Sequence, residues 1–217
     1  MAKPQCLLLV SSSLEGGIQA QSFIHAFTIA HSAFNVTLTS REGRLGDFVG
    51  HDDSSRRWLN EFRSKPYSTP LRLDVIDASR YTALLIPDCN GALYDLSSNR
   101  TLGDLLQHFV EKKKPICAIG SGVAALCSSK STGANQTKWL FANYCLTAPS
   151  VFELARSSTF ATLPIILEDF IKDNAGRYTA SDPGAIHVVV DRFLITGQNE
   201  ASTIMAVQNL ILVTNSR

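Results

Sequence analysis

Short, uninterrupted runs of apolar residues limit most strongly what this chain can fold into. They cover residues 6–10 (CLLLV), 83–87 (ALLIP) and 116–119 (ICAI). Such a run is typical of a β-strand buried on both faces, as in a parallel sheet covered by helices. Residues 101–112 lie between two of these runs and place three leucines and a phenylalanine on one helical face. Strands that alternate with helices predict an α/β fold, with a mainly parallel sheet and helices on both faces.

Other segments extend this pattern along the chain. We predict a strand at 36–39, a hairpin made by 187–190 and 193–196, and helices at 18–33, 163–173 and about 202–212. The sequence contains neither an internal repeat nor a linker. Residues 1–217 are therefore predicted to form a single domain.

Residues 40–70 interrupt the alternation with a polar stretch rich in Gly, Ser, Arg and Pro. It contains one short helical candidate, around residues 57–62. A stretch of this length inside a compact domain is often a functional or interface insertion. The alternative is a solvated surface excursion, and the sequence leaves both interpretations open.

Composition excludes several classes of protein. The formal net charge is +1, which gives no general attraction to nucleic acid or to an anionic membrane. Five irregularly spaced cysteines include no CxxC pair, and no two histidines have ligand spacing, so we expect neither a metal nor another cofactor. The cysteine pattern fits a reducing compartment. No segment approaches the ~18 apolar residues of a membrane span, and the run at 6–10 is too short for a signal peptide.

Four segments resemble one protein superfamily in the expected order. They are YTALLIPDCNGALYDL (81–96), KPICAIGSGVAAL (114–126), LPIILED (163–169) and HVVVDRFLITGQNEAS (187–202). Together they resemble the PfpI and heat-shock glyoxalase-chaperone branch of the class I glutamine amidotransferase-like superfamily. The Thr-Gly-Gln-Asn run in the last segment is distinctive for this branch. The resemblance spans nearly the full chain and implies a flavodoxin-like three-layer sandwich.

The same resemblance implies that the catalytic residues are missing. Family enzymes carry a cysteine at a tight strand-to-helix turn, where the helix N-terminus stabilises its thiolate. That position falls on Gly120, the histidine that follows it falls on Ser121, and Gly122 keeps its identity and anchors the register. A supporting glutamate on the first helix falls on Ser22. We therefore interpret Gly120, Ser121, Gly122 and Ser22, together with Cys89 in the loop 88–91, as parts of a vestigial site.

Cys89 is the thiol that could replace the missing nucleophile. It lies in the loop 88–91, where the family places glycines whose N–H groups form an oxyanion hole. One interpretation is a small-molecule hydrolase, deglycase or glyoxalase that uses this displaced thiol. The other is a buried, inert cysteine. Cys117 falls in mid-strand, where side chains are usually buried.

The leading interpretation is a non-catalytic interaction subunit. The resemblance implies homo-oligomers, because members of the superfamily usually pair through sheet edges and helices. A vertebrate member is regarded as a subunit of an early-endosomal Rab effector complex (FERRY-type) that links mRNA to endosomes. The resemblance thus implies a cytoplasmic protein that protein partners recruit to early endosomes. We expect neither direct nucleic-acid binding nor membrane insertion.

Overall fold

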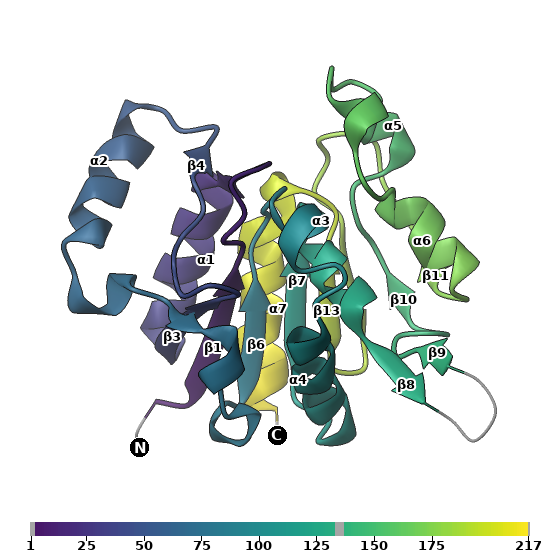
Figure 1. Ribbon diagram of the computed structural model, residues 1–217, viewed down its shortest axis with the longest axis horizontal. Coiled ribbons are helices and arrows are strands. Elements are labelled where there is room, and N and C mark those ends of the chain that lie inside the picture. Colours follow the sequence, from purple (N-terminus) through teal and green to yellow (C-terminus); the bar gives the residue numbers. More distant parts are fainter. Residues whose placement is uncertain (1–2, 133–136, 217) are drawn as a thin grey trace.

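A seven-stranded sheet forms the centre of the computed structural model, which describes residues 3–132 and 137–216. The strand order is β12-β13-β7-β6-β1-β3-β5 (Figure 1). β12 is antiparallel to β13, and the other pairings of this sheet are parallel. The strands are β1 (Gln5–Val10), β3 (Asn35–Ser40), β5 (Leu71–Arg72), β6 (Ala83–Ile86), β7 (Ile116–Ile119), β12 (Val188–Asp191) and β13 (Leu194–Gly197). The predicted α/β fold and the predicted hairpin are confirmed.

Helices cover both faces of this sheet. α1 and α7 pack against each other on one face, and α4 lies on the other with the 3₁₀ helix η4 (Figure 1). The α-helices are α1 (Ala20–Ala33), α2 (Asp53–Arg63), α3 (Ala92–Asp95), α4 (Arg100–Glu111), α5 (Val151–Leu154), α6 (Leu167–Asp173) and α7 (Thr203–Asn215). The 3₁₀ helices are η1 (Pro66–Ser68), η2 (Leu73–Val75), η3 (Ala78–Arg80), η4 (Gly120–Ser128), η5 (Phe160–Thr162) and η6 (Glu200–Ser202).

Short strand pairs lie outside the central sheet. β2 (Ile18–Gln19) pairs with β4 (Phe48–Val49), β8 (Lys130–Thr132) with β9 (Thr137–Trp139), and β10 (Cys145–Leu146) with β11 (Arg177–Tyr178). The first pair corrects the predicted helix at 18–33, because Ile18 and Gln19 belong to β2 and the helix begins at Ala20. The helix predicted at 163–173 likewise begins later, at Leu167.

Burial of the apolar runs explains the central strands. Leu7, Leu8 and Leu9 of β1 are fully buried, and so are all four residues of β6 and of β7. Successive side chains of a strand point to opposite faces, so such a strand needs cover on both sides. Removing this apolar surface from water is the main favourable contribution to folding.

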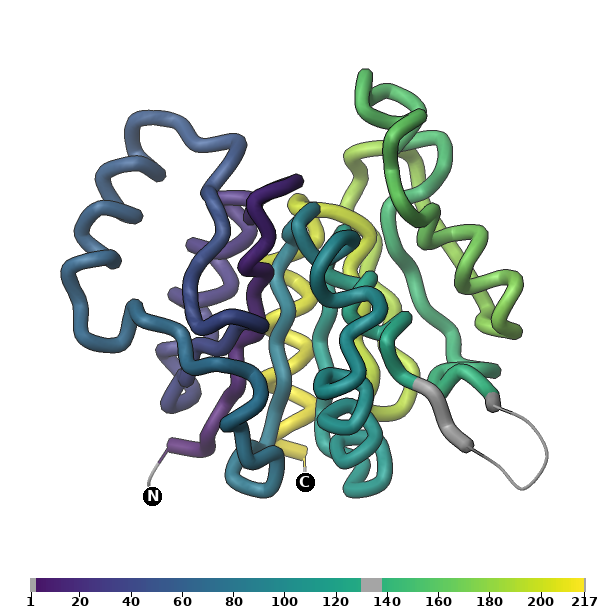
Figure 2. Tube along the Cα trace, in the orientation of Figure 1, coloured from purple at the N-terminus to yellow at the C-terminus, as the bar shows by residue number. Residues whose placement is uncertain are grey.

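The polar stretch at 40–70 is anchored to the core through α2. Asp52 caps the helix by accepting a hydrogen bond from the Ser55 N–H at 2.7 Å. The ring of Phe62, which is 3% exposed, lies 5.2 Å from that of Phe23 and 4.9 Å from that of Phe27 on α1. Figure 2 shows this segment running alongside α1. α2 is therefore a surface helix that packs one apolar face against α1 and leaves its charged side chains exposed.

No helix within residues 3–132 and 137–216 combines the length and the apolar character that crossing a membrane requires.

Candidate functional site

The turn between β7 and η4 is the candidate site, and Gly120 is its first residue. β7 ends at Ile119, and Gly120 opens η4 with a φ of +54°. This left-handed backbone region disfavours any residue that carries a Cβ, typically by 1–2 kcal/mol. The structure thus places Gly120 at the strand-to-helix turn expected from the sequence.

The carboxylate of Asp88 fills the space beside Gly120. Asp88 follows β6, the strand next to β7 in the sheet. A Cβ built on Gly120 would overlap the carboxylate carbon and both carboxylate oxygens of Asp88. Asp88 Oδ1 also accepts a hydrogen bond from the Ser121 N–H, at 2.9 Å. A carboxylate therefore occupies the helix start where a nucleophilic side chain on residue 120 would stand.

Ser22 lies behind this carboxylate and holds its loop. The Ser22 Oγ accepts a hydrogen bond from the Asp88 N–H at 2.9 Å and lies 2.8 Å from the Thr203 Oγ1 of α7. The Asp88 carbonyl accepts from the Gln19 N–H at 3.0 Å. Ser22 has no exposed surface. The position predicted for a supporting glutamate thus holds a hydroxyl that fixes the backbone of Asp88.

Ser121 and Gly122 complete the turn. The Ser121 Oγ donates a hydrogen bond to the Asn90 Oδ1 at 2.7 Å, and Ser121 is 4% exposed. Among the described residues, no imidazole or carboxylate forms a hydrogen bond with this hydroxyl. A Cβ on Gly122 would overlap the carbonyl oxygen of Pro87, so this glycine permits close packing of the loop against η4. Both residues therefore join the 88–91 loop to the turn.

Burial raises the pKa of Asp88 to about 7. The hydrogen bond from the Ser121 N–H acts in the opposite direction, and the carboxylates of Glu200 and Glu153 add to the rise. Burial also raises the pKa of Glu200, and His25 opposes that shift. Asp88 thus exchanges a proton near neutral pH while it occupies the turn.

Cys89 is buried in the loop that follows β6. Its side chain has no exposed surface, and burial raises its thiol pKa far above the ordinary value. Burial does the same for Cys117 in β7. The thiolate is the reactive form of cysteine, so neither residue presents a nucleophile in this conformation.

A cavity of about 300 Å³ opens beside Ser121. Asn90, Tyr94 and Ser121 line one side of it, and Leu154 and Leu163 lie among the residues of the other. All of its lining residues are uncharged, and Cys89 is not among them. The cavity therefore offers hydroxyl, phenol, amide and apolar groups, and its lining contains no thiol, imidazole, carboxylate or amine.

The Thr-Gly-Gln-Asn run positions the wall of this cavity. Gln198 Nε2 donates to Glu153 Oε2 at 2.9 Å, and Asn199 Nδ2 donates to Glu153 Oε1 at 3.0 Å. The Gly184 N–H also donates to Glu153 Oε1, at 3.0 Å. Glu153 and Leu154, which lines the cavity, are adjacent residues of α5. The Thr-Gly-Gln-Asn run thus anchors α5 to the end of β13.

The structure brings Ser22, Gly120 and Ser121 together around Asp88 and packs Gly122 against the neighbouring Pro87, whereas Cys89 is buried and does not line the cavity beside Ser121. Asp88 and Asn90 were not singled out from the sequence. The signal that could have found Asp88 is its place directly after the buried strand that neighbours β7 in a parallel sheet. Metal binding has no support, since no group of three or more His, Cys, Asp or Glu residues within the described parts of the chain could hold an ion.

The chain is similar to known proteins over its whole length. No family model matches the chain. The glutamine amidotransferase-like class 1 domain-containing protein 1 of Xenopus laevis is 55% identical over 100% of this chain and 93% of its own length. The protein of the same name from Danio rerio is 52% identical over 100% and 99%, and that from Homo sapiens is 49% identical over 99% and 96%.

Solved structures share the fold at low identity. The 24 kDa rapid encystment protein of Francisella tularensis has a TM-score of 0.87 at 19% identity, covering 97% of this chain and 99% of its own. Glyoxalase III from Candida albicans has a TM-score of 0.84 at 14% identity, covering 97% of both chains. Drosophila melanogaster DJ-1beta has a TM-score of 0.61 at 16% identity, covering 100% and 95%. With curated relatives at about half identity over the whole chain, the protein belongs to the family of glutamine amidotransferase-like class 1 domain-containing protein 1.

Proposed function

We propose that this protein is a non-catalytic member of its fold superfamily that acts as an oligomeric interaction subunit. One observation carries the proposal: the Asp88 carboxylate occupies the space beside Gly120 that a nucleophilic side chain would need. The Ser121 N–H, at the start of η4, already donates to that carboxylate. In catalytic acyl-transfer sites such an N–H is left free to stabilise a developing oxyanion. The turn thus lacks a nucleophile, and its N–H donor is not free to stabilise an oxyanion.

The rest of the scaffold supports a binding role. The central sheet and its helices are complete, and the side chains that surround the turn are joined by hydrogen bonds. Large apolar side chains remain in contact with solvent, including Leu14 at 78%, Phe152 at 80% and Leu212 at 66% exposure. Exposed apolar groups of this size can contribute to contacts between proteins.

By its resemblance to the vertebrate family member, we propose that the partners belong to an early-endosomal Rab effector complex of the FERRY type, which links mRNA to endosomes. The protein would then be cytoplasmic and would reach early endosomes through these partners. The net charge of +1 gives no reason for direct RNA binding.

Purification of a tagged protein from cells tests this proposal. We expect it to recover other copies of the chain and the subunits of an early-endosomal Rab effector complex, in proportions that stay fixed through size-exclusion chromatography. We also expect Gly120→Cys and Cys89→Ser variants that fold to recover the same partners, because neither residue lies on the surface. A monomer that recovers none of these subunits would contradict the proposal.

The alternative is a hydrolase, deglycase or glyoxalase that uses Cys89. No structural feature favours it, since Cys89 is buried and lies outside the cavity beside Ser121. Turnover that depends on Cys89 would nevertheless replace the present proposal.

A further inference from the structure

The cavity beside Ser121 lies where the order of the strands in the sheet reverses. From β1 the chain crosses to β3 on one side, and it later returns to β6 on the other side of β1. Three connections meet there and each contributes a lining residue: Gly16 follows β1, Asn90 follows β6 and Ser121 follows β7. Ligands of open parallel α/β sheets bind outside the carboxyl ends of the strands at such a reversal. The topology therefore indicates this cavity as the place for a ligand.

The inner wall of the cavity presents hydrogen-bonding groups that the protein does not use. Ser121 is 4% exposed, and its hydroxyl donates to Asn90 Oδ1 at 2.7 Å, which fixes the orientation of the Asn90 amide. Within the described residues, neither Asn90 Nδ2 nor the Tyr94 hydroxyl makes a hydrogen bond. The Ser121 oxygen can still accept one. A ligand would thus find both donors and an acceptor.

Apolar side chains and further hydroxyls make up the rest of the lining. Leu93 belongs to α3, Leu154 to α5, and Leu163 follows η5. The hydroxyls come from three exposed residues, Ser157, Thr159 and Thr162. A monosaccharide has a matching surface, because its ring C–H groups form apolar faces and its hydroxyls surround them. The volume of about 300 Å³ is at the small end of the range of ligand pockets and suits a molecule of that size.

The electrostatics of the cavity favour an uncharged ligand. All of its lining residues are uncharged, so an ionised group would lose hydration without gaining a counter-charge. Two carboxylates also belong to residues directly behind the lining. Asp88 accepts from the Ser121 N–H, and Glu153 precedes Leu154 in α5. An anion would be repelled by both.

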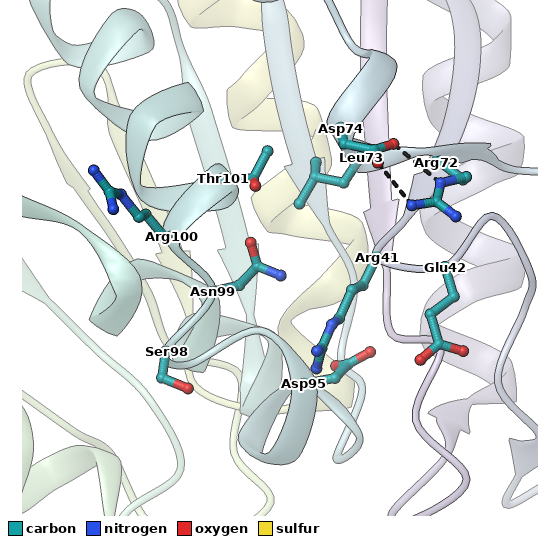
Figure 3. Close-up of a pocket in the computed structure, with 10 residues that line it drawn as sticks. All are labelled: Arg41, Glu42, Arg72, Leu73, Asp74, Asp95, Ser98, Asn99, Arg100 and Thr101. Carbon is teal, nitrogen blue, oxygen red and sulfur yellow. Dashed lines mark hydrogen bonds and ion pairs between the residues drawn. The ribbon is translucent and has the colours of Figure 1, made fainter.

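The larger cavity of the molecule, of about 520 Å³ at the carboxyl ends of β3 and β5, has a different character (Figure 3). Its lining contains three arginines and three carboxylates, namely Arg41, Arg72, Arg100, Glu42, Asp74 and Asp95. Figure 3 shows Arg72 paired with Asp74, through hydrogen bonds of 3.1 and 2.7 Å. Because its charges are balanced and partly paired, this cavity does not select a ligand.

We propose that the cavity beside Ser121 binds a small uncharged polyol of monosaccharide size. One ligand oxygen would accept from the Asn90 amide, and a ligand hydroxyl would donate to the Ser121 oxygen. The C–H face of the ligand would pack against the leucines. The inference extends the proposed function, because a turn without a nucleophile can hold such a molecule without converting it. Binding is measured apart from the recovery of partner subunits, so either proposal can fail alone.

Titrations followed by amide NMR test the proposal with probes of similar size. The polyols are glucose, galactose and myo-inositol, glucuronate adds a carboxylate, and cyclohexanol keeps a six-membered ring with one hydroxyl. We expect at least one polyol to cause saturable shifts at the amides of Asn90, Ser121 and Leu163. Glucuronate and cyclohexanol should bind more weakly than that polyol. The absence of saturable shifts with all three polyols would overturn the proposal.

Two of the probes test the chemical class of the ligand. If glucuronate bound as tightly as the best polyol, the assignment of an uncharged ligand would be wrong. If cyclohexanol bound as tightly, the apolar surface alone would explain binding, and the assignment of a polyol would be wrong.

Asn90→Asp tests the predicted contact. The substitution keeps Oδ1 as an acceptor for the Ser121 hydroxyl and removes the amide donors, so polyol affinity should fall about fivefold or more, as expected for one hydrogen bond. Asn60→Asp is the matched control, because Asn60 is exposed on α2 and does not line the cavity. We expect it to leave the affinity unchanged. Equal losses in the two variants would overturn the contact with Asn90.

Leu163→Trp tests the cavity from its other wall without changing Asn90. The larger side chain should fill part of the cavity and abolish the saturable shifts, while the rest of the amide spectrum shows that the protein is folded. A folded Leu163→Trp variant that binds the polyol as tightly as the wild-type protein would place the ligand elsewhere and overturn the proposal.

Discussion

The Asp88 carboxylate stands where the side chain of residue 120 would begin, and this is possible because residue 120 is a glycine. The two residues come from the ends of neighbouring strands, β6 and β7. The carboxylate in turn accepts the hydrogen bond of the Ser121 N–H at the start of η4. Gly120 and Asp88 thus depend on each other, and a substitution at either position should alter the packing of the other residue.

Gly120→Ala should destabilise the protein by at least about 2 kcal/mol, because a Cβ is strained at this φ and also overlaps Asp88. Urea denaturation measures the free energy of unfolding. Gly184→Ala is the matched control, since Gly184 also has a positive φ, +80°, but a Cβ there meets nothing within 4 Å. Equal losses in the two variants would show that Asp88 does not fill the space beside Gly120.

A cysteine at residue 120 should become reactive only when Asp88 is also removed. In Gly120→Cys, the nearby carboxylate disfavours a thiolate and competes for the Ser121 N–H. In Gly120→Cys/Asp88→Ala, the Asp88 carboxylate would no longer compete with the thiol for that N–H and for the start of the helix. We expect alkylation of the double variant to be at least about tenfold faster than that of the single variant, which is one pKa unit.

Peptide mass spectrometry distinguishes the new thiol from the native ones. Cys6, Cys89 and Cys117 have no exposed surface, so they should stay unlabelled in the folded protein. If the thiol of the double variant reacted no faster than these three, the turn could not activate a nucleophile. The interpretation of the turn as a vestigial catalytic site would then be wrong.

Asp88 should make stability depend on pH. Burial raises its pKa in the folded protein to about 7, whereas an unfolded Asp releases its proton near pH 4. Between these values the folded state binds more protons than the unfolded one, so stability falls as pH rises and is lowest above about pH 7. From about pH 5 to about pH 8, the loss should be on the order of 2 kcal/mol.

Asp88→Asn isolates this effect, because the amide oxygen can still accept from the Ser121 N–H while the side chain stays neutral. Denaturation at both pH values should show a smaller loss in the variant than in the wild-type protein. An equal or greater loss in the variant would mean that Asp88 is ionised throughout the range.

α2 should contribute to stability through Phe62. Phe62→Ala removes a ring that is 3% exposed and stacked 5.2 Å from Trp58, so the free energy of unfolding should fall by about 3 kcal/mol or more. Arg57→Ala, on the exposed side of the same helix, should change it by less than about 0.5 kcal/mol. Similar effects of the two changes would mean that α2 is not anchored to the core through Phe62.

Local sequence patterns were sufficient to predict six of the seven strands of the sheet, and missed only the two-residue edge strand β5. The runs at 6–10, 83–87 and 116–119 became β1, β6 and β7 because burial on both faces leaves the same apolar signature in any context. Gly122 fixed the register of the turn, so Gly120 could be placed at its start. In the polar stretch, the few apolar residues of α2 gave too weak a pattern to predict where the helix packs.

The occupant of the turn could not be predicted in this way. Asp88 meets Gly120 through the pairing of β6 with β7, and Ser22 meets Asp88 through the packing of α1. Such contacts depend on tertiary structure and leave no local spacing. Cys89 is a candidate nucleophile from the sequence because thiols are reactive. Its exposure, however, depends on the packing of the 88–91 loop, which a single sequence does not reveal.

Turnover by the purified protein tests the absence of catalysis most directly. Glutamine and methylglyoxal should be offered to the wild-type chain, to Cys89→Ser and to a variant that lacks all five cysteines. Because Asp88 occupies the place of the nucleophile, we predict no turnover above the buffer control in any of them. Turnover by the wild-type chain that disappears in Cys89→Ser would contradict a non-catalytic protein and assign the reaction to that thiol. Turnover that survives removal of all five cysteines would place the chemistry at another residue altogether.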